Sequence, residues 1–255
     1  MFQSLPRAAV LSIMMAACAL AHGEEAGVTP YRPSVSTPAQ LPTPGQLEFE
    51  AGWLSARADG ARRDSVPVLF KLAFSEQWGV TVGAESYVDL RQGDQSHLRG
   101  LGDTVVTLKR AFIVDEKTAF GLELGAKLPS ARSDIGSGKA DATVNGIFSR
   151  DIGAVHMDAN LNLTRLGAHD ADTGSTLVGV ADSFSSAIDE HWGALAELSA
   201  TRQGGAPWAT QLLLGLTYSP SKQMTVDFGL IHGLSDSATH LGLFGGVVLP
   251  LAKLW

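Results

Sequence analysis

Cysteine is almost absent from this chain, with one residue among 255. A single Cys excludes an intramolecular disulfide and any zinc site that several cysteines would build. Charged residues are also few, at 18% of the chain, against the roughly 25% usual in soluble domains. Acidic residues outnumber Lys and Arg by 26 to 19, which gives a formal charge of −7. Because a nucleic-acid-binding protein needs a basic surface, this balance argues against nucleic acid as a partner.

Long hydrophobic runs are missing as well. After residue 21 no run of 18 apolar residues occurs, so no transmembrane helix is predicted there. The apolar stretch at residues 8–21 is shorter than the ~20 residues that span a bilayer. It follows Arg7 and ends in Ala19-Leu-Ala21, which predicts a cleaved signal peptide over residues 1–21. Lipid attachment at Cys18 is the alternative for this segment, and cleavage after Ala21 would remove that Cys.

Residues 22–45 are rich in proline, which denies the backbone both helical and ladder hydrogen bonds. We therefore expect this segment to be a periplasmic linker that precedes a single domain at residues 46–255. The prolines are Pro30, Pro33, Pro38, Pro42 and Pro44.

From Gln46 onward the sequence changes to a period of two. Between residues 154 and 166, for example, the apolar Met157 and Leu161 alternate with the polar Asp158 and Asn160. Successive side chains of a strand point to opposite faces, so each such segment is a strand with one apolar and one polar face. Strands are predicted at residues 46–57, 65–75, 79–90, 102–113, 119–129, 140–150, 154–166, 176–187, 192–202, 209–218, 224–232 and 240–251.

The connections between these strands alternate in length. Those after even-numbered strands are short, and those after odd-numbered strands are longer, polar and rich in Gly and Asp. This parity is typical of outer-membrane barrels, which have short periplasmic turns and longer external loops. We predict an all-β fold: a transmembrane, antiparallel, up-and-down β-barrel of about 12 strands in the outer membrane. The alternative is a soluble sandwich or lipocalin-type barrel with its apolar faces inward.

Aromatic residues fall near several strand ends, where a membrane barrel carries a girdle at each interface. The chain ends in Trp255, and a terminal aromatic residue on the last strand predicts recognition by the barrel-assembly machinery. The predicted girdle comprises Trp53, Trp78, Trp192, Trp208 and Tyr218.

Several short, Gly-rich motifs resemble the bacterial outer-membrane family that is tied to phenol meta-cleavage pathways. The resemblance covers the chain from about Thr37 onward, and the family implies a signal peptide, an outer-membrane barrel and uptake of small, often aromatic, compounds. One departure is Lys253, where the end signal usually has an apolar or aromatic residue. The motifs are Thr37-Pro38, Pro44-Gly-Gln-Leu-Glu48, Leu101-Gly-Asp103, Leu108-Lys109, Gly125-x-Lys-Leu-Pro129 and Gly136-Ser-Gly-x-x-Asp141.

If the apolar faces contact lipid, the opposite faces line a polar lumen in which acids outnumber bases. A conducting lumen of this kind favours cations or neutral polar solutes. The alternative is a plugged interior in which the charges pair across the lumen. The predicted lining residues are Glu48, Glu50, Lys71, Glu85, Asp103, Lys109, Glu123, Lys127, Asp141, Asp158, Asn160, Glu197 and Asp227.

These observations predict a passive channel or facilitator for small molecules, possessing no cofactor, no metal and no catalytic residue. Its expected partners are the lipid bilayer, the assembly machinery and an unidentified solute. His156 and Asp158 could share a strand face, but two ligands are too few for a typical metal site. A structural or adhesion barrel is one alternative. A barrel enzyme is the other, since a catalytic triad is recognised by geometry rather than by spacing.

Overall fold

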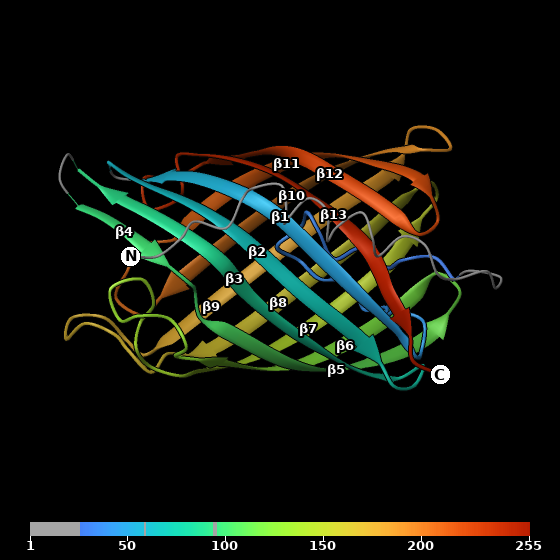
Figure 1. The fold of residues 1–255 in the computed structure, drawn as a ribbon, viewed down its shortest axis with the longest axis horizontal. Helices are drawn as coiled ribbons and strands as arrows, with labels where there is room; N and C mark the ends of the chain where they lie inside the picture. Colours follow the sequence, from blue (N-terminus) through green and yellow to red (C-terminus); the bar gives the residue numbers. More distant parts are fainter. Residues whose placement is uncertain (1–25, 59, 94–95) are drawn as a thin grey trace, which may run out of the picture.

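The period-two segments form antiparallel strands that close into a barrel (Figure 1). The computed structural model describes residues 26–58, 60–93 and 96–255, so the predicted signal peptide and Cys18 lie outside the described residues. The strands of the described residues are β1 (Gln46–Ala58), β2 (Ala61–Ala73), β3 (Trp78–Gln92), β4 (Ser96–Gly100), β5 (Thr104–Asp115), β6 (Thr118–Leu128), β7 (Asp141–Ile152), β8 (Val155–Arg165), β9 (Thr176–Ala187), β10 (Trp192–Gln203), β11 (Ala209–Ser221), β12 (Met224–Gly233) and β13 (Leu241–Lys253).

The first and last strands close the barrel. β1 pairs with β13 from Gln46↔Lys253 to Arg57↔Leu241, and β2 pairs with β3. The short β4 pairs with the end of β3, while β5 pairs with its first half. β4 therefore extends the rim, and the other twelve described strands form the closed antiparallel barrel that the sequence predicts. Closure pairs each of these twelve strands with a neighbour on both sides, as lipid requires.

The two faces of the wall have opposite character. Outward-facing apolar side chains are exposed, as at Leu124 (49%) and Leu161 (61%), whereas the inward-facing Glu48 and Lys71 are fully buried. An apolar exterior around a polar interior is the arrangement of a membrane barrel, and it is the reverse of the soluble alternative. The described part of the chain contains no helix that is long and apolar enough to cross a membrane.

Some strand bounds differ from the prediction. β2 begins at Ala61 rather than at residue 65, so β1 and β2 form a tight hairpin that pairs up to Ala58↔Ala61. β4 forms within the predicted connection 91–101, and β5 begins at Thr104 rather than at residue 102. The added strand residues of β2 and β4 lack apolar alternation because they carry charged residues such as Arg62 and Arg99 on their outward face, and the period-two signal therefore misses them.

The barrel has two distinct ends. Short turns after β2, β5, β7, β9 and β11 lie at one end with the C-terminus, which Figure 1 marks on the right. We call this the turn end. The opposite, loop end carries the longer connections, at residues 129–140, 166–175, 204–208 and 234–240. The tight β1–β2 hairpin is an exception to the predicted length parity, since it also lies at the loop end.

The orientation of the wall predicts unequal costs for a new charge on its two faces. We expect Leu124→Arg, on the exposed apolar face, to destabilise the barrel by about 2–4 kcal/mol, because a cation near the bilayer midplane is costly. Thr143→Arg is the matched control, since Thr143 lines a lumen cavity of about 250 Å³ beside Glu123 and Asp141. Urea unfolding of protein refolded into vesicles measures both costs, and equal costs would contradict the assignment of faces.

Candidate functional site

Residues 26–45 lie inside the barrel, and we call them the plug. Figure 1 shows this blue segment within the wall of strands. The plug begins and ends at the turn end, where the Val28 N–H donates to the Lys222 carbonyl (2.8 Å) and the Gly45 N–H to the Ala73 carbonyl (2.9 Å). This placement differs from the linker that the proline content suggested. The reason is that the wall offers the hydrogen-bond partners that a proline-rich backbone cannot find in a ladder.

Backbone N–H groups of the plug donate to side chains of the wall. The Tyr31 N–H donates to Glu50 Oε1 at 2.8 Å, and the Ser36 N–H donates to Glu197 Oε2 at 2.8 Å. Similar bonds join Thr29 to Glu48 (3.1 Å), Thr37 to Asn160 (3.1 Å) and Ala39 to Ser149 (2.7 Å). The accepting side chains belong to β1, β7, β8 and β10. The plug is thus tied to strands on several sides of the barrel.

Two buried lysines hold the plug by their charge. The Nζ atoms of Lys71 and Lys109 both lie over the Tyr31 ring, at 4.3 and 4.2 Å from its centroid. The Tyr31 hydroxyl donates to the Gln40 carbonyl at 3.0 Å. Lys71 and Lys109 also donate to the plug carbonyls of Thr29 and Pro38. Cation–π contacts are strongest where water is excluded, as it is here.

The lysine charges are balanced by acids of the wall. Lys71 Nζ lies 3.0 Å from Glu48 and 2.5 Å from Glu50, and Lys109 Nζ lies 3.2 Å from Glu123. Burial, together with the carboxylates of Glu123, Glu50 and Glu48, raises the pKa of the Tyr31 phenol well above its ordinary value. The phenol therefore stays neutral and keeps its donor proton.

Arg32 makes the direct ion pair between plug and wall. Its Nε and Nη2 donate to the two carboxylate oxygens of Asp227, at 3.0 and 3.1 Å. The guanidinium occupies a slot between Gly52 and Gly246, which are paired across β1 and β13. A Cβ atom at either glycine would overlap the guanidinium. These two glycines make room for one plug side chain.

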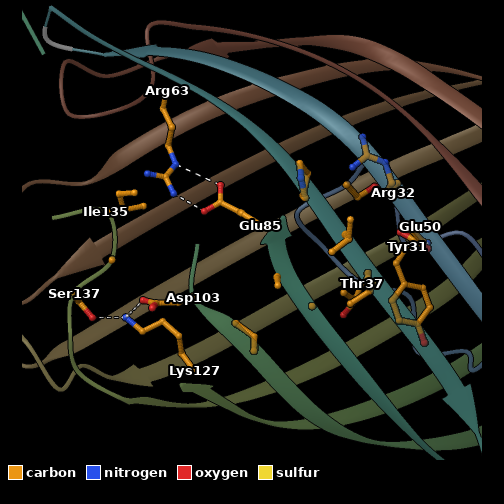
Figure 2. Close-up of a pocket in the computed structure, with 18 residues that line it drawn as sticks. Tyr31, Arg32, Thr37, Glu50, Arg63, Glu85, Asp103, Lys127, Ile135 and Ser137 are labelled. Carbon is orange, nitrogen blue, oxygen red and sulfur yellow. Dashed lines mark hydrogen bonds and ion pairs between the residues drawn. The ribbon is translucent and has the colours of Figure 1, made fainter. Parts of the chain in front are cut away.

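Cavities lie on either side of the plug. The outer cavity, of about 690 Å³, is bounded by Tyr31 and Thr37 of the plug and by Ile135 and Ser137 of the loop 129–140 (Figure 2). The inner cavity, of about 720 Å³, lies between the plug and the turns at 151–154 and 186–193. In the latter turn, backbone N–H groups of His191 and Trp192 lower the pKa of Asp189. The plug therefore lies between an outer and an inner chamber of the lumen.

Ion pairs line the outer cavity. Arg63 of β2 pairs with Glu85 of β3, and Lys127 of β6 reaches Asp103 (3.5 Å) and Asp141 (2.7 Å). Figure 2 shows Arg63, Glu85, Asp103 and Lys127 facing the cavity, with the Arg63–Glu85 pair well separated from Lys127. The paired charges leave a polar rim around the cavity.

The predicted lining residues divide into three groups, all on the inward side of the wall. One group contacts the plug: Glu48, Glu50, Lys71, Lys109, Glu123, Asn160, Glu197 and Asp227. A second group bounds the outer part of the lumen: Glu85, Asp103, Lys127 and Asp141. Asp158, the remaining residue, lines the inner cavity and accepts hydrogen bonds from Ser149 and His156.

The sequence analysis missed the plug residues that complete the site. Tyr31, Arg32 and Thr37 stand in a segment without periodicity, and their proline neighbours concealed their role. Arg63 was missed because it was placed in a loop. His156 bonds to Asp151 and Asp158. No group of three or more His, Cys, Asp and Glu side chains that could hold a metal occurs in the described ranges.

The predicted girdle residues occupy different heights on the barrel. Trp78, Trp192 and Tyr218 lie near the turn end, where the Trp192 and Tyr218 rings are 4.9 Å apart, and Trp208 precedes β11 at the loop end. Trp53 lies in the middle of β1, on the exposed face. Trp255 packs against Gly45, whose φ of 81° and close contact with the Trp255 carbonyl both favour glycine.

The comparisons with known proteins agree with this architecture. Residues 32–249 match the model of a family described as "Putative MetA-pathway of phenol degradation". The NanC porin is similar in structure, with a TM-score of 0.57 and 9% identity over 81% of this chain and 99% of that chain. A KdgM porin in complex with disordered oligogalacturonate is also similar in structure, with a TM-score of 0.55 and 9% identity over 80% of this chain and 98% of that chain. At this identity the likeness concerns the fold alone. No curated protein matches the chain.

The buried lysines predict a marked difference between two substitutions. Lys109→Met should reduce the free energy of unfolding by about 3–5 kcal/mol, because it leaves Glu123 as a buried charge without its ion-pair partner. Lys127→Met is the control and should cost less, because the Lys127 side chain is 22% exposed. Urea titrations followed by heat-modifiable gel migration measure both. A loss at Lys127 as large as at Lys109 would contradict the assigned role.

Proposed function

Because this chain belongs to the MetA-pathway of phenol degradation family, and because its barrel holds between two chambers a segment that belongs to no wall strand, we propose that it is a passive outer-membrane channel for small molecules. The plug is its gate. The proposal involves no catalysis and no cofactor. Its lipid partner is the bilayer around the apolar exterior, and Trp255 is the proposed signal for the assembly machinery.

The observation that carries the proposal is the position of the plug between the outer and inner cavities. The plug belongs to no strand of the barrel wall, and hydrogen bonds and ion pairs hold it there. Its removal from the middle of the lumen would therefore join the two chambers without breaking a ladder. A twelve-stranded barrel is intermediate between small filled barrels and wide porins, which suits solutes of modest size.

The outer cavity suggests the class of solute. Its wall combines the apolar Pro67, Leu69, Val105 and Ile135 with the paired charges described above. Orientation by a few polar groups within a mainly apolar wall is typical of small-molecule sites. Small amphipathic solutes, aromatic ones included, fit this lining better than ions do, because the carboxylates of the lumen are engaged by lysines, Arg32 and backbone N–H groups.

A structural barrel with a permanently closed lumen is the second candidate. The buried contacts of Tyr31, Lys71 and Lys109 favour it, because a segment held by so many bonds can serve as a fixed core. The two candidates differ in one property, namely whether weakening the plug opens a path.

Gly52→Ala tests the gate. Its new Cβ would displace the flexible guanidinium of Arg32 from the slot and so weaken the Asp227 ion pair. We expect higher single-channel conductance in planar bilayers and faster uptake of small aromatic solutes into proteoliposomes. Gly245→Ala is the control, since a Cβ there has its nearest neighbour, the Asp227 carbonyl oxygen, at 3.4 Å. Its conductance should equal that of the unmodified protein.

A reversible disulfide between plug and wall should lower the conductance instead. The Ala39 N–H donates to Ser149 Oγ at 2.7 Å, which places the plug backbone beside this wall side chain and makes cysteines at the two positions a disulfide lock to test. Oxidised A39C/S149C should conduct less than the reduced protein, and each single-cysteine variant should not respond to reductant. Conductance that is zero in every variant, with folded barrels in all of them, would support the structural candidate instead.

A further inference from the structure

A basic patch lies on the outward face of the barrel at the loop end, and we call it the rim patch. It is built by two rows of side chains that run across neighbouring strands. The strand register sets both rows. The first row crosses β1 to β4 and is Arg57↔Arg62↔Arg91↔His97. The second row crosses β2 to β4 and is Asp64↔Asp89↔Arg99. Figure 1 shows these strands continuing together to the left end of the barrel.

The rim patch is organised around one carboxylate. The Asp89 carboxylate forms ion pairs with Arg91, whose Nε lies at 3.2 Å, and with Arg99, whose Nε lies at 3.0 Å. The Nε2 atom of His97 lies 2.5 Å from the same carboxylate. The Asp89 side chain is 6% exposed, whereas those of Arg91 and Arg99 remain 50% and 59% exposed. Asp89 therefore fixes the guanidinium groups in place while much of each side chain stays open to the surroundings.

Charge in the rim patch is unbalanced. Arg57, Arg62, Arg91 and Arg99 stand against two carboxylates, Asp64 and Asp89, in a chain whose formal charge is −7. In the first row Arg62 lies directly between Arg57 and Arg91. Like charges that face each other across a sheet are destabilising. A row of this kind is stabilised when an anion binds between its members.

The height of the rim patch on the wall indicates which anion reaches it. On the same strands, nearer the turn end, the outward face carries exposed apolar side chains, among them Phe70 and Val82. Tyr87, which is 41% exposed, lies between these and the charges and is within 3.4 Å of Asp89. An amphipathic aromatic side chain between apolar and charged surfaces is typical of a membrane interface. The charges therefore begin where the hydrocarbon layer ends.

We propose that the rim patch binds the phosphate groups of a phosphorylated glycolipid in the outer leaflet. Guanidinium groups match the geometry of phosphate oxygens through paired hydrogen bonds. The lipid chains would lie along the apolar wall below, and the phosphates would neutralise the arginine row. This inference rests on the proposed outer-membrane location, but it is independent of whether the lumen conducts.

Binding to the refolded mature chain in an uncharged detergent tests the proposal. The probes are diphosphorylated lipid A, the same lipid without its phosphates, and inorganic phosphate. We expect tight binding of the diphosphorylated lipid, weakened by salt, and much weaker binding of the other two. The R91Q/R99Q variant should bind the diphosphorylated lipid at least about tenfold more weakly, since charge-assisted hydrogen bonds are lost.

Arg132→Gln is the matched control, because Arg132 is an exposed, ion-paired arginine in the loop 129–140 at the same end. Its lipid affinity should equal that of the unmodified protein. Equal affinity for the phosphorylated and dephosphorylated lipids would overturn the proposal, as would equal loss in the control or inorganic phosphate binding as tightly as the lipid. The lipid comparison needs only the unmodified protein, so it decides the matter even where R91Q/R99Q fails to fold. Lipid binding by a barrel without conductance would separate this inference from the channel.

Discussion

The pairing of buried charge inside the barrel is the constraint on which the other features depend. A carboxylate or ammonium group taken out of water costs several kcal/mol unless a partner compensates it, of the order given for real proteins. Lys71 and Lys109 are fully buried, and the acids of the wall compensate their charge. Glu48 and Glu50 also accept hydrogen bonds from backbone N–H groups of the plug, and Glu123 accepts one from the Thr37 hydroxyl. The plug and the wall thus satisfy each other.

This mutual dependence separates rigid from movable parts. Continuous ladders hold the wall strands, and opening one would leave a row of backbone groups without partners in lipid. The plug forms no ladder with the wall and is held largely through side chains, so a change in its position would leave the strand pairing of the wall intact. Arg32 lies in a slot between two glycines, so added volume at either glycine would act on the plug through this side chain.

The sequence by itself determined the barrel, because period-two alternation directly reports which face of each strand meets lipid. Leu124 and Leu161 on one face, and Glu123 and Asn160 on the other, follow from position along the chain. The same pattern placed Glu50, Lys71 and Asp227 inside. It failed at the loop-end parts of β2 and at β4, since strands that extend past the hydrocarbon layer carry charges such as Arg62 and Arg99 on their outward face.

Only the tertiary structure decided what the inward residues contact. Register and closure bring Glu50 of β1, Lys71 of β2 and Lys109 of β5 around Tyr31, which stands in a segment without any periodic signal. The glycines at 52 and 246 are far apart in sequence, so the sequence alone did not show the arginine between them. Likewise, the arginine row of the rim patch exists only when β1 to β4 lie side by side. Alternation records the environment of each strand face, whereas contacts between distant segments depend on how the closed barrel brings them together.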